Sequence, residues 1–379
     1  MTAPSETSVL RVGILGSGNI ARVHAVGWNT YPEKARITAI ADLDADRARA
    51  FSDLHTGGSA AVYPSLESML QDDNIDVVDI CLPHHLHTDA VIASSEAGKA
   101  ILCEKPLCTT LEDARRAKAA IEASGVPFMS AHNQLFQPSL LEARRLLTTG
   151  VLGRPFLFRS IETFQSRSFS PHANTPSTPG GGQMGWRTDV KQSGGGELLD
   201  TGYHSTYRLL SLANNDRPIE VTGFLSRFLL EGWPTEDTGQ VTVRFASGAI
   251  GEILTSWALD VEGNRQFEVS AEFGALAGAA TFLNHQVYGW PSPNTRTFEP
   301  IASFTAEIGH FIDVVLEGAP NPANIDIATR VLQVIKGAYL SASLGQTVSL
   351  PEDPAADPVP GRSEERTPFD VTVLEDVLA

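Results

Sequence analysis

Two short stretches of the chain contain residues that could move a proton to or from a substrate. In Glu104-Lys105-Pro106, the lysine follows an apolar run typical of a strand and is held in place by the proline. Such a lysine can hydrogen-bond a substrate hydroxyl and help to lower its pKa. In the second stretch, Asp200 and His204 are four residues apart and would share one face of a helix. The histidine could accept a proton near neutral pH while the carboxylate orients it or contacts the substrate, although a solvated surface pair would look the same.

A glycine-rich turn near the start of the chain has the spacing of a dinucleotide-binding motif. The stretch is Gly16-Ser17-Gly18-Asn19-Ile20-Ala21, directly after an apolar strand and at the start of a helical pattern. The first glycine permits a tight turn, the second lets the backbone approach a pyrophosphate, and the small alanine allows close packing of helix on strand. The helix N-terminus then offers N–H groups to the phosphates. A glycine-rich turn without a ligand is the alternative.

An acidic residue ends the second predicted strand, 26 residues after the first glycine. This residue is Asp42, in Ala39-Ile40-Ala41-Asp42. A carboxylate at this position can accept hydrogen bonds from the adenosine ribose and would repel a 2′-phosphate, which favours NAD over NADP. No basic residue lies between Leu43 and Asp46. Alternatively, Asp42 or Asp44 only caps the following helix.

The first 130 residues alternate short apolar runs with helical patterns. Because parallel strands need crossover connections, this alternation predicts a doubly wound parallel sheet with helices on both faces. The predicted strands are 9–15, 37–41, 77–82, 100–103 and 128–132, and the predicted helices are 20–29, 45–54, 66–70, 87–97 and 111–124.

The pattern changes beyond about residue 150, where short glycine-containing turns favour antiparallel pairing. We predict an α+β half with a large, mostly antiparallel sheet and helices on one face. Its strands are 153–165, 219–230, 238–246, 249–259, 264–271 and 275–283, and its helices are 196–213, 302–317 and 325–343. A long Gly/Pro/Ser-rich connection, 166–196, is typical of a functional loop. The expected domains are 1–133 and 134–350, followed by an extended tail, 351–379, that is mobile or reaches over a neighbour.

Composition excludes several classes of protein. Lys and Arg number 28 against 45 Asp and Glu, for a net charge of −17, so nucleic acid and anionic membrane surfaces are not expected partners. No apolar run is long enough to span a membrane. Three cysteines without CxxC spacing favour a reducing compartment, with neither disulfides nor a metal site. The polar start of the chain leaves no room for a signal peptide, and we expect the cytoplasm.

Taken together, these motifs resemble the Gfo/Idh/MocA oxidoreductases. The resemblance runs from about residue 9 to 350 and rests on five ordered matches: GSGNIA, the stretch 83–106 with AGKAILCEKPL, Trp186-Arg187, GGGELLDTGYH and SASLGQTVSL. It implies a Rossmann domain followed by a domain built on an open sheet. It also implies a homodimer or homotetramer that assembles through the exposed face of that sheet.

The resemblance also implies residue roles. Lys105, Asp200 and His204 would be the catalytic trio, and the Lys105–Pro106 peptide bond is often cis in the family. The nicotinamide side of the cofactor site would be lined by Leu82, Pro83, His84, His87, Glu104 and Lys105. The substrate would be contacted by Asn133, Trp186 and Arg187 together with the catalytic trio.

The sequence therefore predicts an NAD-dependent dehydrogenase that oxidises a secondary hydroxyl of a sugar, glycoside or cyclic polyol. His204, assisted by Lys105, would remove the hydroxyl proton while the carbinol hydride passes to nicotinamide. Two alternatives stay open. The chain could retain NAD and use transient oxidation to hydrolyse or eliminate glycosides, or it could be a non-enzymatic sensor of NAD or sugars.

Overall fold

The computed structural model describes residues 9–164, 185–214, 216–230, 232–259 and 265–365. The chain forms two compact units, one of residues 1–136 with 301–329 and one of residues 137–300 with 330–379. The expected division kept 134–350 together. The segment 301–329 instead returns to the first unit, because the helix it contains packs on the first helix of that unit.

The first unit contains a six-stranded parallel sheet in the order β3-β2-β1-β4-β5-β6. This order confirms the predicted doubly wound sheet and places its reversal point between β1 and β4. Its strands are β1 (Leu10–Leu15), β2 (Ala35–Ala41), β3 (Ala61–Tyr63), β4 (Val77–Ile80), β5 (Ala100–Glu104) and β6 (Phe128–Ala131). The three-residue β3, which pairs only with β2, was not predicted.

Helix ends in this unit follow from local sequence. Asp44, Ser65 and Thr110 cap helix N-termini with their side chains, and Gly57 and Gly125 end helices in the left-handed conformation. Asp44, and not Asp42, therefore caps α2, and the hydrogen bonds of Asp42 are made with other groups. The helices are α1 (Asn19–Asn29), α2 (Ala45–Thr56), α3 (Leu66–Leu70), α4 (His87–Glu96), α5 (Leu111–Ser124) and α10 (Ser303–Glu317), with short 3₁₀ turns η1 (His84–Leu86) and η2 (Asn133–Phe136).

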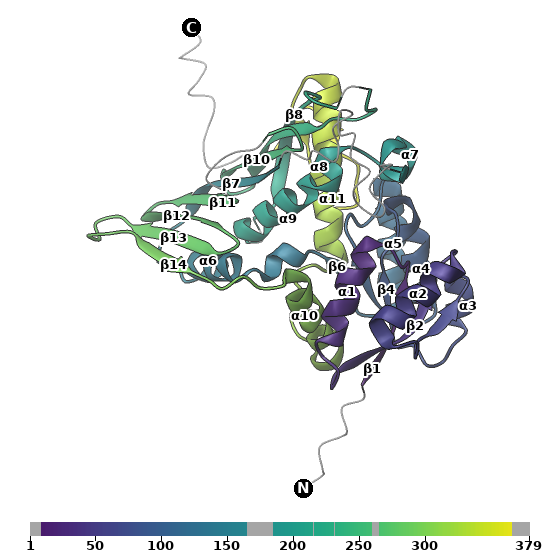
Figure 1. Cartoon of the computed structure of the whole chain (residues 1–379). Coiled ribbons are helices and arrows are strands. Elements are labelled where there is room, and N and C mark those ends of the chain that lie inside the picture. Colours follow the sequence, from purple (N-terminus) through teal and green to yellow (C-terminus); the bar gives the residue numbers. More distant parts are fainter. Residues whose placement is uncertain (1–8, 165–184, 215, 231, 260–264, 366–379) are drawn as a thin grey trace. The chain divides into compact units, whose positions relative to one another are not determined.

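Helices α1 and α10 lie side by side in this unit (Figure 1). The indole of Trp28 packs edge-on against the ring of Phe311, with centroids 6.2 Å apart, and both side chains are fully buried. This contact joins segments that are far apart in the sequence.

The second unit contains a ten-stranded sheet in the order β14-β13-β12-β11-β7-β10-β9-β8-β15-β16. All neighbouring strands with a given register are antiparallel except β7 and β10, which confirms the mostly antiparallel prediction. The strands are β7 (Pro155–Thr163), β8 (Pro218–Ser226), β9 (Thr238–Phe245), β10 (Ile250–Ser256), β11 (Phe267–Ala271), β12 (Gly274–Ala279), β13 (Phe282–Val287), β14 (Asn294–Thr297), β15 (Val348–Ser349) and β16 (Val359–Pro360).

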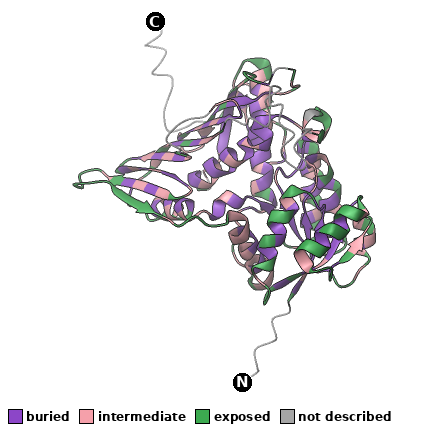
Figure 2. Cartoon of the chain, in the orientation of Figure 1, coloured by how far each residue is buried: buried purple, intermediate pink, exposed green. Residues whose placement is uncertain are grey.

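Helices cover one face of this sheet, so buried and less buried residues alternate along the strands (Figure 2). Close approach requires glycine at two points: a side chain on Gly202 would meet Thr255 Oγ1 at 2.8 Å, and one on Gly223 would meet the Ala338 carbonyl at 2.6 Å. The helices are α6 (Pro138–Thr148), α7 (Val190–Ser193), α8 (Glu197–Asp200), α9 (Gly202–Ala213) and α11 (Ile325–Leu344), whose residues 325–329 belong to the first unit, with a 3₁₀ turn η4 (Gly185–Thr188).

The helix predicted over 196–213 is interrupted at Thr201. Asp200 N–H bonds the carbonyl of Gly196, whereas His204 N–H bonds that of Thr201, only three residues earlier. Asp200 therefore ends α8 and His204 lies in the first turn of α9. The expected shared face of one continuous helix is replaced by two short helices in succession.

The tail prediction was wrong for the part of the tail that the structure describes. Residues 351–365 pack against their own unit: β16 pairs with β15, and Ala355 is buried. The Gln333 amide donates to the carbonyls of Asp353 and Ala356 at 2.9 and 3.0 Å, and Arg330 donates to that of Pro351 at 2.9 Å. Since prolines lack N–H groups, a proline-rich segment needs mainly donors, and α11 provides them. Residues 366–379 lie outside the described residues.

Among the described helices, none combines the length and the apolar character that crossing a membrane requires.

Replacing the buried Gln333 by Ala should release the described tail. The carbonyls of Asp353 and Ala356 would lose their donor, at a cost of about 1–3 kcal/mol of local stability. Amide hydrogen exchange should rise across 351–360. Gln286→Ala, the same change at an exposed position, is the control, and equal exchange in both variants would contradict the prediction.

Candidate active site

The glycine turn lies at the carboxyl end of β1, next to the end of β4. Gly16 has a φ of +90°, and a side chain there would lie 2.5 Å from the Cys81 carbonyl oxygen, so glycine is required. A side chain built on Gly18 would meet no described atom within 4 Å. The open backbone at Gly18 and the N-terminus of α1, at Asn19 and Ile20, fit the pyrophosphate of a dinucleotide.

Asp42 follows β2 and is buried in a dense set of hydrogen bonds. Its carboxylate accepts from Ser17 N–H at 2.8 Å, from Ser17 Oγ at 2.6 Å and from Asp44 N–H at 2.9 Å. Burial alone would raise the pKa of Asp42, but hydrogen bonds from Arg47 and Ser17 outweigh it and lower the pKa to about 2. Ser17 therefore links the glycine turn to the acid predicted to bind ribose.

Arg47, in the first turn of α2, was missed by the sequence reasoning. Its guanidinium pairs with Asp42, with Nη2 2.6 Å from Oδ1 and Nε 3.2 Å from Oδ2. Arg47 directly follows Leu43–Asp46, the stretch that contains no basic residue. A basic residue in the first turn of the helix that follows Asp42 was the sequence signal that could have predicted this ion pair.

The loop after β4 carries Leu82, Pro83, His84 and His87. His87 is fully buried, with Nδ1 2.8 Å from the Pro106 carbonyl and Nε2 2.8 Å from the Leu82 carbonyl. Burial lowers the pKa of His87, so the neutral ring donates to one carbonyl at a time. His84 is also buried, with its ring 6.1 Å from that of His87. His87 thus ties this loop to Pro106, and the cofactor contacts of these residues stay a prediction.

The Glu104-Lys105-Pro106 segment begins at the last residue of β5. Its Lys105–Pro106 peptide bond is cis, as the resemblance implied. Glu104 Oε2 accepts the Lys105 N–H at 2.9 Å. Burial, helped by the nearby charge of Lys105, lowers the pKa of His132 to about 3. Lys105 therefore lies at the carboxyl edge of the sheet, close to the end of β6.

Asn133 follows β6 at the same edge. Its amide donates to Ser303 Oγ at 2.8 Å, at the first residue of α10. This hydrogen bond fixes the Asn133 amide against α10, and its contact with a substrate stays a prediction. Of the long loop predicted to be functional, 165–184 lies outside the described residues.

In the second unit, three predicted residues come together. Arg187 Nε lies 2.6 Å from Asp200 Oδ2, and the guanidinium stacks 4.3 Å from the ring centroid of Trp186. An aromatic face, a cation and a carboxylate in one place can bind a polyhydroxylated molecule through its C–H surface and its hydroxyls.

The partner of His204 is a residue that the sequence reasoning missed. Tyr207 is buried, and its hydroxyl lies 2.6 Å from His204 Nδ1. Tyr207 is three residues beyond His204 on α9, the spacing at which side chains on a helix meet. This hydrogen bond fixes the imidazole orientation.

Buried acids support the turn that carries Asp200. Glu197 is fully buried, burial raises its pKa well above the usual value, and its Oε1 accepts a hydrogen bond from Thr255 Oγ1 at 2.6 Å. Glu236 accepts the Leu198 N–H at 3.0 Å and the Tyr339 hydroxyl at 2.6 Å. These contacts anchor α8 to the sheet and to α11.

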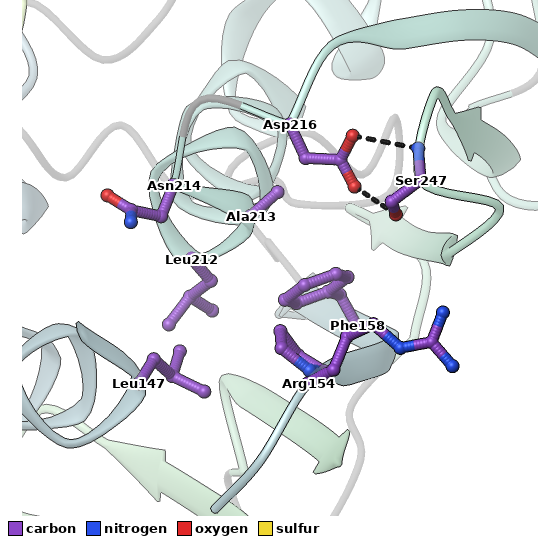
Figure 3. Close-up of a pocket in the computed structure, with 9 residues that line it drawn as sticks. Leu147, Arg154, Phe158, Leu212, Ala213, Asn214, Asp216 and Ser247 are labelled. Atoms are coloured by element: carbon purple, nitrogen blue, oxygen red, sulfur yellow. Dashed lines mark hydrogen bonds between the residues drawn. The ribbon is translucent and has the colours of Figure 1, made fainter. Parts of the chain in front are cut away.

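A cavity of about 370 Å³ lies elsewhere in the second unit (Figure 3). It is lined by residues at the C-terminal end of α9, including Leu212 and Asn214, and by Phe158 from β7. Asp216 at its edge accepts from the Ser247 N–H at 3.1 Å. His204 lies at the other end of α9, about 13 Å away along the helix axis. The cavity therefore contains none of the predicted site residues.

Comparison with known proteins identifies the family. Residues 10–132 match an oxidoreductase family with an NAD-binding Rossmann fold, and residues 140–277 match the GFO/IDH/MocA C-terminal domain. The chain belongs to the Gfo/Idh/MocA oxidoreductase family. This Gfo/Idh/MocA membership confirms the resemblance inferred from the motifs.

Named relatives share about a quarter of its residues. The 1,5-anhydro-D-fructose reductase of Ensifer adhaerens is 28% identical over 71% of this chain and 75% of its own length. D-xylose 1-dehydrogenase (NADP(+)) 2 of Haloferax volcanii is 28% identical over 89% of this chain and 99% of its own. A structure of levoglucosan dehydrogenase with NADH and levoglucosan has a TM-score of 0.81 at 23% identity, over 91% of this chain and all of that one, which shows a shared fold.

Asp42→Asn should lower the free energy of unfolding at neutral pH and flatten its acid dependence. The folded pKa of Asp42 is about 2, below its unfolded value of 3.8. The stabilisation is therefore complete above pH 3.8 and is lost as the pH falls toward 2. Denaturant unfolding at a series of pH values measures this. Asp46→Asn, at an exposed acid, is the control, and the same acid limb in both variants would refute the prediction.

Proposed function

We propose that this chain oxidises a secondary hydroxyl of a sugar, glycoside or cyclic polyol with NAD. Membership of the Gfo/Idh/MocA family and relatives named for sugars and an anhydro sugar support a carbohydrate substrate. The single observation that carries the proposal is the placement of Lys105 at the carboxyl edge of the sheet that also bears the open glycine turn. In doubly wound sheets this edge is where ligands bind.

The residues present fit a dinucleotide. Gly16, Ser17, Gly18, Asn19 and Ile20 would hold the pyrophosphate, since the backbone at Gly18 is open. Asp42 would accept the ribose hydroxyls. Leu82, Pro83, His84, His87 and Glu104 would line the nicotinamide side. When bound, NAD accepts a hydride from the carbinol carbon.

The chain's own residues would handle the proton. His204 Nε2 takes the proton of the substrate hydroxyl in the tautomer whose Nδ1–H donates to the Tyr207 hydroxyl oxygen. The Lys105 ammonium hydrogen-bonds the same oxygen and stabilises negative charge on it as the proton leaves. Asp200 and Asn133 orient neighbouring hydroxyls, while Arg187 holds the Asp200 carboxylate and Trp186 packs on the sugar face.

The preference for NAD over NADP would rest on Asp42. Its carboxylate is ionised at neutral pH and would repel a 2′-phosphate. Arg47 is the nearby cation that could favour such a phosphate, but it is paired with Asp42. The acid would thus act twice, by its own charge and by engaging the arginine.

We also propose a homodimer or homotetramer formed through the open face of the ten-stranded sheet. On this face Arg159 pairs with Glu252 and Glu268, and Phe224 and Ile250 are exposed. A second copy of the chain on this face would cover these exposed apolar side chains.

Lys105→Met and His204→Asn should each lower the rate of hydride transfer by about 10²–10⁴-fold, the range for general acid–base groups. NAD affinity should be unchanged, because the glycine turn and Asp42 are intact. Stopped-flow absorbance of NADH with a panel of sugars and polyols measures the rate. Unchanged turnover in both variants would remove their assigned roles, and product formation without net NADH would favour the NAD-retaining alternative.

Asp42→Ser should move cofactor preference toward NADP by about tenfold or more, since removing one charge repulsion near a phosphate is worth at least ~1.4 kcal/mol. The released Arg47 should contribute to this gain. Asp42→Ser/Arg47→Ser should therefore lose much of the NADP affinity that the single variant acquires. Fluorescence titration with NADPH and NADH gives both dissociation constants, and equal NADPH binding by the two variants would exclude a role for Arg47.

A further inference from the structure

A fully buried histidine lies between two carboxylates in the first unit, and the proposed function does not use it. His24 is on α1. Its Nδ1 lies 3.0 Å from both carboxylate oxygens of Asp79 on β4, and its Nε2 lies 3.0 Å from Oε1 of Glu104 at the end of β5. An ionised carboxylate only accepts hydrogen bonds. Where both carboxylates are ionised, both ring nitrogens donate, and only the imidazolium form can do this.

The surroundings support a charged ring. Burial alone would lower the pKa of His24, but the charge of Asp79 outweighs burial and holds the pKa well above the usual value. Asp79 also accepts the Trp28 Nε1–H at 2.7 Å. From α10, Glu307 faces the same group, and burial raises its pKa well above the usual range. The ring of Phe304, also on α10, lies 5.7 Å from the imidazole.

This cluster does not have the chemistry of a metal site. Ligand atoms of His24, Asp79 and Cys81 lie within 4.8 Å of one another. However, burial raises the pKa of the Cys81 thiol to about 12, and the thiol points to Asp79 Oδ1 at 3.7 Å as a donor. A metal would need the thiolate and an unprotonated ring nitrogen.

The ion pair connects directly to the segment that carries Lys105. Glu104 uses one oxygen for His24 and the other, Oε2, for the Lys105 N–H at 2.9 Å. On the other side of Lys105, the Pro106 carbonyl is held by His87 at 2.8 Å. Two buried histidines from different helices thus lie against this segment, His24 through Glu104 and His87 at the Pro106 carbonyl, which shares the single N–H of the neutral His87 ring with Leu82.

We propose that His24 is a positioning residue for Lys105: as an imidazolium paired with Asp79, it fixes the Glu104 carboxylate, which in turn fixes the Lys105 backbone. The functional consequence rests on the proposed role of Lys105. Without the charged ring, Glu104 would be a buried carboxylate without its counter-charge, and would turn away or take up a proton. Turning away frees the Lys105 N–H and protonation weakens its acceptor, and either change moves the ammonium.

The charge of His24 can be read without turnover. In ¹⁵N-histidine NMR of the full chain, the His24 signals are assigned by their loss in His24→Gln. Both ring nitrogens should stay protonated well above pH 6.5, the ordinary histidine pKa. Titration near pH 6.5 would overturn the inference.

Stability gives a second reading of the same charge. Because the pKa of His24 is raised in the folded state, its contribution is complete below pH 6.5 and is lost as the pH rises through the folded pKa. The wild type should therefore lose unfolding free energy in alkali, and His24→Gln should lose less over the same range. His310→Gln, which changes a partly exposed histidine of the same unit, should behave as wild type.

The coupling to Lys105 is tested by ¹³C-methylation of lysines, with the Lys105 signal assigned by its loss in Lys105→Met. That signal should shift in His24→Gln and not in His310→Gln. Glu104→Gln, a milder change that replaces one acceptor by a donor, should shift the Lys105 signal as well. It serves as the test variant if His24→Gln folds poorly. An unchanged Lys105 signal in both variants would overturn the inference.

Kinetics show whether the coupling matters for the reaction. His24→Gln should lower kcat by about 10- to 100-fold, the range for residues that orient a reacting group, with KM and the dissociation constant of NAD unchanged. An equal loss through KM alone would contradict positioning. Normal turnover in Lys105→Met would instead contradict the proposed function, while the two NMR results would still decide the inference.

Discussion

The stability of the first unit depends on a counter-charge for one buried carboxylate, that of Asp79, inside its parallel sheet. Asp79 lies in the middle of β4, a strand buried on both faces, and is itself fully buried. A buried carboxylate is tolerated only with a counter-charge and donors to its oxygens, and α1 provides both, through His24 and Trp28. Helix α1 starts at the glycine turn. The helix that would hold the pyrophosphate therefore also provides His24, the counter-charge of Asp79 in the sheet. The helix that follows the turn, the central strand and the end of β5 are thus linked by one buried set of charged hydrogen bonds.

Most of the fold could be predicted from the sequence, because local periodicity and helix caps set most elements. Where prediction failed, the signal was short or lay far away in the chain. The edge strand β3 has three residues, β14 is exposed at every position, and α6 begins at a proline within a stretch without a strong pattern. The return of 301–329 to the first unit depends on contacts such as Trp28 with Phe311, which no local pattern reveals.

The candidate site was predicted in its motif residues but not in their partners. Strand ends and turn glycines place Gly16, Asp42 and Lys105 at one edge of the sheet, because parallel strands share a direction. The partners Arg47, Tyr207 and His24 come from helix turns whose side chains meet the motif only in three dimensions. Arg47 and Tyr207 had helical spacing as a signal. His24, which is 80 residues from Glu104, had none.

The two units handle buried acids in opposite ways, and this has a chemical consequence. In the first unit Asp79 accepts bonds from a charged ring, so charge is retained beside Lys105. In the second, burial raises the pKa of Glu197, which disfavours a negative charge beside Asp200, and Glu197 accepts a hydrogen bond from the Thr255 hydroxyl. A negative environment attracts an ammonium, whereas a carboxylate paired with Arg187 would be repelled by a second negative charge below it. Partner residues therefore set the electrostatics of each motif.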